Sequence, residues 1–122
     1  MKYLLTILFS LFATNLYSLE LTLNQGTVKP TPIAITDLFS SNTDLEKTGE
    51  NISSVISDNL ERSGLFIPIN KKAFIQSNES LVTQPRFEDW KVLKAQHLVA
   101  GKIKTNGNKI SIEFRLYDVF AQ

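Results

Sequence analysis

Cysteine is absent from the 122-residue sequence, and histidine and tryptophan occur once each. Without cysteine, the chain has no disulfide framework, no thiolate metal site and no thiol nucleophile. A bacterial lipid anchor is also excluded, because it attaches to a cysteine just after the signal. The single histidine, His97, has no second imidazole or thiolate with which to share a metal ion. We therefore expect no metal and no cofactor, and a core drawn from the 43% of apolar residues must hold the domain together.

An excess of charge is also missing. The chain has 13 basic and 12 acidic residues, and Lys2 is the only charged residue among the first 18. Nucleic-acid binding requires basic residues in excess on one face. The charge balance therefore argues against a nucleic-acid partner.

No apolar run reaches the length of a membrane span. The run Leu4–Ala13 follows the positively charged start of the chain and is succeeded by the polar segment Asn15–Ser18. A spanning helix needs about 20 apolar residues, whereas the apolar part of a signal peptide needs about 7–15. We predict that residues 1–18 are a cleavable signal peptide, and that the mature protein is soluble and does not insert into the membrane. An uncleaved N-terminal anchor is the alternative.

Residues 19–31 combine a short alternating segment with a proline-containing stretch. Leucines at every second position of Leu19–Leu23 alternate with polar residues, which is typical of a short strand with one apolar face. Pro30 and Pro32 remove backbone donors and favour extended chain. We interpret this segment as an arm that adds a strand to the sheet edge of another protein, with pairing inside its own domain as the alternative. The predicted partner-binding residues are Leu19, Glu20, Leu21, Thr22, Leu23, Asn24, Gln25, Gly26, Thr27, Val28 and Lys29.

A buried strand and an amphipathic helix open the predicted domain. Ile33 and Ile35 begin the strand, which runs toward Leu38. From Asp44 the apolar residues follow a helical period, and Gly64 ends the helix because a left-handed conformation is expected there. The expected apolar face comprises Leu45, Gly49, Ile52, Val55, Ile56, Asn59 and Leu60, and the expected cap is Thr43 or Asp44.

Shorter elements follow this helix. Leu65–Ile69 predicts a strand, in which Pro68 indicates a sheet edge. Asn70–Phe74 predicts a capped helical turn, and residues 76–83 predict a polar connection. A second helix begins near Pro85 and extends to Gln96 or His97, with Phe74, Phe87 and Trp90 expected in the core.

The last part of the sequence predicts a β-hairpin. Leu98–Lys104 has the composition of a strand, and Asn106-Gly107 indicates a type I′ turn. The returning strand has the clearest alternation in the chain. One side carries Ile110, Ile112, Phe114 and Leu116, and the other carries Ser111, Glu113, Arg115 and Tyr117.

No motif suggests catalytic groups. Glu88 and Asp89 are explained by the positive end of a helix dipole, and no nucleophile elbow is present. We therefore predict a protein that is not an enzyme and acts by binding. Lys102, Lys104 and Lys109 flank the hairpin turn, where they either recruit an acidic partner or keep an exposed edge from aggregating.

Four segments carry a family resemblance: Pro32–Ile35, Ile52–Phe66, Trp90–Gly101 and Phe114–Val119. Together they resemble the N-terminal domain of the TolB family, the periplasmic component of the Tol-Pal system of Gram-negative bacteria. The resemblance implies a mixed α/β fold, a sheet flanked by helices, similar to the anticodon-binding domain of class II tRNA synthetases. It also implies a fragment that lacks the family's β-propeller and the last strand and helix of its N-terminal domain.

The resemblance further implies an organisation and partners. The chain divides into a signal peptide (1–18), an arm (19–31) and a TolB-like α/β domain (32–122). In the family the mature N-terminal segment binds the inner-membrane protein TolA. By position this role falls on Leu19–Lys29, although Gln25-Gly26-Thr27 departs from the acidic character usual there. Family contacts to the lipoprotein Pal lie mainly on the propeller.

The implied function is a periplasmic protein-protein interaction module of the Tol-Pal system, which supports outer-membrane integrity and constriction during cell division. The alternative is a self-contained small periplasmic regulator of an envelope enzyme. Continuation of the reading frame past Gln122 into propeller blades would favour the first hypothesis.

Overall fold

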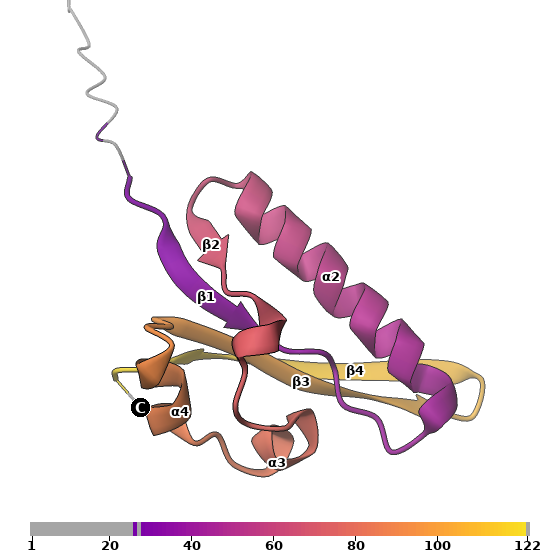
Figure 1. Cartoon of the computed structure of the whole chain (residues 1–122). Helices are drawn as coiled ribbons and strands as arrows, with labels where there is room; N and C mark the ends of the chain where they lie inside the picture. Colours follow the sequence, from indigo (N-terminus) through magenta and orange to yellow (C-terminus); the bar gives the residue numbers. More distant parts are fainter. Residues whose placement is uncertain (1–25, 27, 122) are drawn as a thin grey trace, which may run out of the picture.

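The computed structural model describes residue 26 and residues 28–121. Its four strands form one mixed sheet in the order β2-β1-β3-β4, with β1 parallel to β2 and β3, and β4 antiparallel to β3. The predicted mixed α/β fold, with helices flanking the sheet, is confirmed (Figure 1). In chain order the elements are β1 (Thr31–Ile35), the 3₁₀ turn η1 (Thr43–Leu45), α2 (Glu46–Arg62), β2 (Phe66–Pro68), the 3₁₀ turn η2 (Lys71–Ala73), α3 (Asn78–Thr83), α4 (Phe87–Val92), β3 (His97–Asn106) and β4 (Lys109–Asp118).

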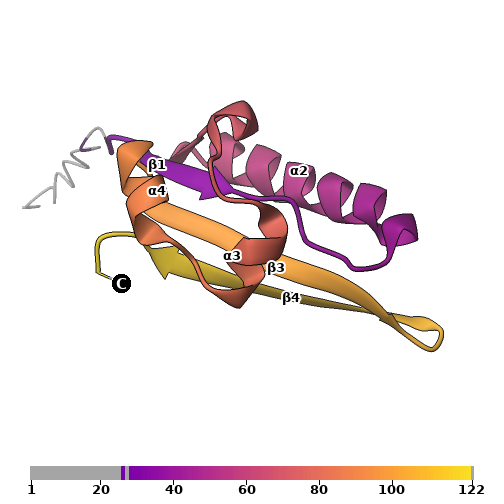
Figure 2. The ribbon, with the colours of Figure 1, turned by 60° about the horizontal axis from the view of Figure 1, so that its bottom comes forward.

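Helices cover both faces of the sheet. The long helix α2 lies on one face, and the short helices α3 and α4 lie on the other, as Figures 1 and 2 show. Under α2, Ile56 and Leu60 pack on Ile33, Ile35 and Val99. Near the start of α2 the core continues through Leu38, Leu45, Ile52 and Ile103.

β1 begins at Thr31, earlier than the apolar alternation indicates, and ends at Ile35 rather than running on to Leu38. Pro32 is accommodated because it lies where β3 has not yet begun, since the first β1–β3 pair is Ile33 with His97. The carbonyl of Pro32 accepts a hydrogen bond from the backbone N–H of Gln96 at 3.0 Å. The proline therefore costs the sheet no ladder hydrogen bond.

The start of α2 differs from the prediction. Asn42, rather than Thr43 or Asp44, supplies the cap, since its side chain accepts a hydrogen bond from the backbone N–H of Asp44 at 3.0 Å. This cap begins η1, and α2 follows with no side-chain cap of its own. The end of the helix is as predicted, because Gly64 has the left-handed φ of 73°.

The apolar face of α2 is rotated relative to the prediction. Val55 is 59% exposed and Asn59 is also exposed, whereas Ser53 is fully buried. Residues three and four apart share a helix face, so Gly49, Ser53, Ile56 and Leu60 form the row that meets the sheet. The sequence reading included Val55 because it is apolar and missed Ser53 because it is polar.

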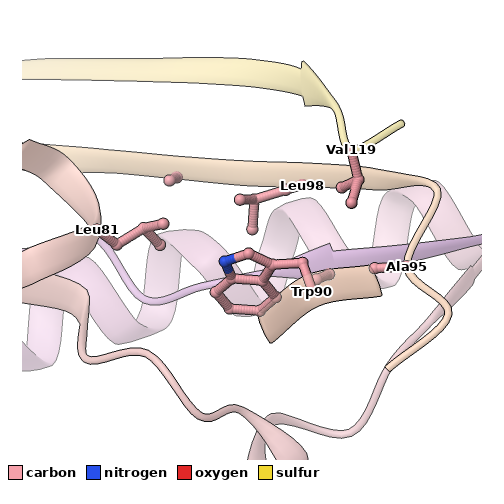
Figure 3. Close-up of a cluster of buried hydrophobic side chains, with 7 residues drawn as sticks. Leu81, Trp90, Ala95, Leu98 and Val119 are labelled. Carbon is pink, nitrogen blue, oxygen red and sulfur yellow. The ribbon is translucent and has the colours of Figure 1, made fainter. Parts of the chain in front are cut away.

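The other face of the sheet is organised around Trp90. Figure 3 shows Trp90 among Leu81, Ala95, Leu98 and Val119, all of them fully buried or nearly so. The ring of Phe74 meets the indole edge to face with centroids 5.0 Å apart, and Phe87 meets Tyr117 in the same way at 5.8 Å. The prediction that Phe74, Phe87 and Trp90 are core residues is confirmed.

Two predictions for residues 76–97 are wrong. The expected polar connection contains the helix α3, which Ser77 caps by accepting from the backbone N–H of Ser80 and which buries Leu81. The expected long second helix is the six-residue α4, which ends at Val92. Lys94 has a φ of 60°, a conformation that stops the helix well before Gln96. The capped turn at Asn70–Phe74 is confirmed as η2.

The hairpin is confirmed, but its turn is of another type. Asn106 pairs with Lys109, which leaves Gly107 and Asn108 as the two loop residues. Gly107 has a φ of 61°, and among the described residues with side chains only Lys94 has a positive φ. A type I′ turn needs positive φ at both loop positions, whereas type II′ needs it only at the first. The turn is therefore of the II′ kind.

Candidate partner-binding site

The predicted partner-binding residues fall mostly outside the part of the chain that the structure describes. This holds for Leu19–Gln25 and Thr27, while Gly26, Val28 and Lys29 are described and exposed. Val28 has 64% of its surface exposed. Among the described residues, the first backbone hydrogen bond to the sheet is donated by Thr31, to the carbonyl of Leu65 at 2.9 Å. The described end of the arm, just before β1 in Figure 1, thus has exposed side chains.

The arm joins the sheet next to the C-terminal turn of the chain. Gln96 links the two regions, because its N–H donates to Pro32 while its carbonyl accepts from the N–H of Val119 at 2.9 Å. The carboxylate of Asp118 accepts from the N–H groups of Ala121 and Phe120, each at 3.0 Å. These hydrogen bonds lower the pKa of Asp118, and the nearby His97 lowers it further. The Asp118 carboxylate thus caps the turn that follows β4.

A polar cluster connects the end of β1, α2 and η2. The hydroxyl of Ser53 contacts the carboxylate of Asp37 at 2.5 Å and accepts from the ammonium of Lys71 at 2.9 Å. The Lys71 ammonium also pairs with Asp37. Serine, lysine and aspartate together resemble an activated nucleophile, but Ser53 is fully buried and no substrate can reach it. The cluster ties three elements together and offers no catalytic surface.

A second polar cluster lies inside the Trp90 core. The side-chain carbonyl of Gln76 accepts from the indole N–H of Trp90 at 3.2 Å and from the backbone N–H of Arg86 at 2.9 Å. Its amide donates to the carbonyl of Gln84 at 2.8 Å. Gln76 is almost fully buried, so these bonds satisfy groups that water does not reach. Sequence reasoning missed this residue because a glutamine beside Ser77-Asn78-Glu79-Ser80 has the composition of a loop.

The outer strand β4 presents an apolar row that sequence reasoning did not assign to a surface. Its apolar side chains are largely uncovered although they alternate regularly with polar residues. On the opposite side of the strand, Glu113 pairs with Lys102 of β3 at 3.0 Å. The hydrogen bond from Lys102 lowers the pKa of Glu113, and the charges of Lys102, Lys104 and Arg115 add to this effect. The apolar row comprises Ile110, Ile112, Phe114 and Leu116.

Over the described residues, no three histidine or acidic side chains lie together as a metal site would need. No helix in that same part of the chain has the length and apolar character of a membrane span.

Comparison with known proteins gives a consistent result. The profile of the family described as the TolB amino-terminal domain matches residues 19–122. The Tol-Pal system protein TolB of Paramagnetospirillum magneticum is 48% identical over 99 residues, which cover 80% of this chain and 22% of that protein. The chain therefore spans about a fifth of the length of this relative.

A solved structure agrees with the fold. The crystal structure of TolB from Acinetobacter baumannii superimposes with a TM-score of 0.59 at 24% identity, covering 76% of this chain and 21% of the other. At this identity the likeness shows the fold, a mixed sheet with helices on its faces.

Proposed function

The chain belongs to the TolB amino-terminal domain family, and from this we propose that it is a periplasmic protein-protein interaction module of the Tol-Pal system. In this proposal it supports outer-membrane integrity and constriction during cell division. Residues 1–18 direct export and are removed, residues 19–31 form the arm, and residues 32–122 form the domain that carries it. TolA is the proposed partner of the arm, and Pal is a partner only of the longer protein.

The exposure of the arm where it meets β1 is the observation that carries this proposal. Val28 and Lys29 are exposed, and backbone pairing with the sheet begins at Thr31. β1 is held on both sides, by β2 and β3, so the arm is attached to a rigid base. A segment with alternating leucines that leaves such a base is suited to strand addition, in which backbone hydrogen bonds give affinity and alternate side chains give selectivity.

We propose a binding role without catalysis. Among the residues that the structure describes, the grouping with a nucleophile-like composition, Asp37, Ser53 and Lys71, is closed by the complete burial of its serine. The proposed mechanism therefore rests on surface complementarity at the arm.

The proposal is tested with TolA from the same organism. Binding of the exported chain to the periplasmic part of TolA is measured by calorimetry, beside a variant that lacks residues 19–29 and a double variant, Leu21→Asp with Leu23→Asp. The deletion is expected to abolish binding. The double variant is expected to weaken it at least about tenfold, because two apolar contacts are lost (about 1.4 kcal/mol for each factor of ten).

A matched control tests whether a new charge at an exposed apolar residue outside the arm also weakens TolA binding. Val92→Asp introduces the same charge at an apolar residue of α4 that is 73% exposed, and TolA binding should be unchanged. Undiminished binding after deletion of the arm would overturn the proposed mechanism.

A further inference from the structure

A crevice lies beyond the carboxyl end of β1, between the start of α2 and the start of α3. β2 ends at Pro68, opposite Ile33, so the chain after Ile33 has no described strand beside it on that side. On its other side this chain stays bonded to β3. The N–H of Phe39 donates to the carbonyl of Gly101 at 2.9 Å, and its carbonyl accepts from the N–H of Ile103 at 2.8 Å. The early end of β2 thus leaves one side of this segment open.

The two connections that border the crevice lie on different faces of the sheet. α2, which follows β1, covers one face, and α3, which follows β2, covers the other (Figures 1 and 2). In sheets with parallel strands, ligands bind in the crevice outside the carboxyl ends of the strands, where such connections separate. The crevice of this chain has that position.

The crevice has the size of a small-molecule site. Its volume is about 460 Å³, and ligand sites usually have about 300–1,000 Å³. Its lining comes from the loop Asp37–Ser40, from the start of α2 with the turn before it, and from Asn78 at the start of α3. The strand β4 and the described residues after it contribute nothing to this lining.

Polar side chains of the lining have unused hydrogen-bonding groups. Ser40 is only 7% exposed, and its Oγ accepts from the backbone N–H of Asn42 at 3.1 Å. The O–H of Ser40 itself has no acceptor among the residues that the structure describes. The hydroxyl of Thr43 and the amide of Asn78 likewise make no side-chain hydrogen bond within the described chain. Buried polar groups are normally paired, so the buried donor of Ser40 is suited to a bound ligand.

The lining also carries one negative charge that no described side chain neutralises. Asp37 pairs with Lys71, and Glu50 pairs with Lys47 at 2.8 Å. Glu46, which is exposed at the start of α2, has no ion-pair partner in the described part of the chain. A positively charged group in the crevice is therefore attracted to Glu46.

We propose that this crevice binds a small hydroxylated amine, the class to which amino sugars belong. The ammonium group of the ligand pairs with the carboxylate of Glu46, and its hydroxyl groups bond with Ser40, Thr43 and Asn78. Because a hydroxyl group both donates and accepts, it suits two hydroxyl groups and an amide. This inference concerns a site separate from the arm and goes beyond the proposed function.

Glucosamine is the probe for this site. Its binding to the exported chain is followed in heteronuclear NMR spectra, in mildly acidic buffer in which the amine is protonated. Saturable shifts are expected at the backbone amides of Ser40, Thr43 and Asn78. Because Glu46 is exposed and its ion pair is screened by solvent, a dissociation constant in the millimolar range is expected. Spectra without saturable shifts at these amides overturn the proposal.

Two further compounds separate the two parts of the ligand. N-acetylglucosamine has a similar ring without the positive charge, and methylamine has the charge without the hydroxyl groups. Each is expected to bind at least about tenfold more weakly than glucosamine. Equal binding of N-acetylglucosamine overturns the ion pair with Glu46, and equal binding of methylamine overturns recognition of the hydroxyl groups.

Variants of the lining test the assignment of the site. Glu46→Gln removes the charge and keeps the shape, so glucosamine binding should weaken about tenfold. Glu61→Gln makes the same change at an exposed position near the other end of α2 and should bind as wild type does. Ser40→Ala, shown to be folded by circular dichroism, should also bind more weakly. Equal binding by the wild type and Glu46→Gln overturns the assignment.

The arm provides a separate control. Deletion of residues 19–29 should leave glucosamine binding unchanged, although it abolishes the proposed TolA binding. Loss of glucosamine binding after this deletion would place the site on the arm and overturn its assignment to the crevice.

Discussion

The two faces of the sheet are packed in different ways. On one face a single helix, α2, approaches closely because Gly49 and Ser53 are small. A methyl group on Gly49 would overlap the backbone carbonyl of Leu38. On the other face, six-residue helices and loops surround Trp90, and Gln76 holds the indole N–H. The long helix thus comes close at its small residues, whereas the short helices and loops pack around one large side chain whose N–H is hydrogen-bonded.

The largest effect is expected on the Trp90 face. Trp90→Ala removes the largest fully buried side chain, so the free energy of unfolding should fall by about 3–5 kcal/mol. Urea denaturation followed by circular dichroism measures the change. Val92→Ala, at an exposed residue of the same helix, is the control and should differ little from wild type. A loss below about 1 kcal/mol for Trp90→Ala would show that this face does not depend on the indole.

The polar contacts of the two faces should contribute different amounts to the free energy of unfolding. Gln76→Leu leaves the indole N–H and two backbone groups without their partner, and should lower the free energy of unfolding by about 2 kcal/mol. Lys71→Met removes a partly exposed ion pair on the α2 side and should cost less than about 1 kcal/mol. Chemical denaturation of both variants makes the comparison. Equal losses would contradict the difference between the faces.

Gly49→Ala tests the close approach of α2. Overpacking against Leu38 costs about 1–3 kcal/mol, and the higher helix propensity of alanine returns about 1 kcal/mol. A net loss of about 1 kcal/mol is therefore expected in urea denaturation. Ser54→Ala, at an exposed position of the same helix, should show only the gain. Stabilisation by Gly49→Ala would mean that the helix moves away at no cost.

The smallest effect is expected at Asp118, which ends β4 and caps the turn that follows it. Its pKa is lowered below the ordinary 3.8 by the N–H groups of Ala121 and Phe120. A carboxyl with a lowered folded-state pKa stabilises the fold fully above its unfolded value, and this contribution is lost as pH falls through the folded value. The melting temperature of Asp118→Ala should thus lie slightly below wild type at pH 7 and converge with it below pH 3.8. A constant difference would contradict this.

Regular patterns in the sequence predicted the main elements. The period of Leu45–Leu60 gave the helix α2, Gly64 gave its end, and Asn106-Gly107 gave the hairpin. Helix α3 was missed because its cap and most of its residues are polar, and only the tertiary contact of Leu81 indicates a buried face. Local pattern thus predicts elements, while packing decides their limits.

The candidate surfaces were less predictable. The alternation in β4 indicates one apolar face but does not say whether another element covers it. Its exposure follows from the position of α2, which packs over β1 and the inner part of β3. For the arm, the alternation at Leu19–Leu23 remains a prediction, because these residues lie outside the described part of the chain.

The β2 edge of the described sheet offers little to an incoming strand. On β2, Leu65 and Ile69 direct their backbone groups to β1, so Phe66 and Pro68 face outward, and Pro68 has no N–H to donate. A strand arriving there finds a single donor. A proline on an edge strand is one of the devices that keep a sheet from pairing with another chain, so this edge is protected against strand addition.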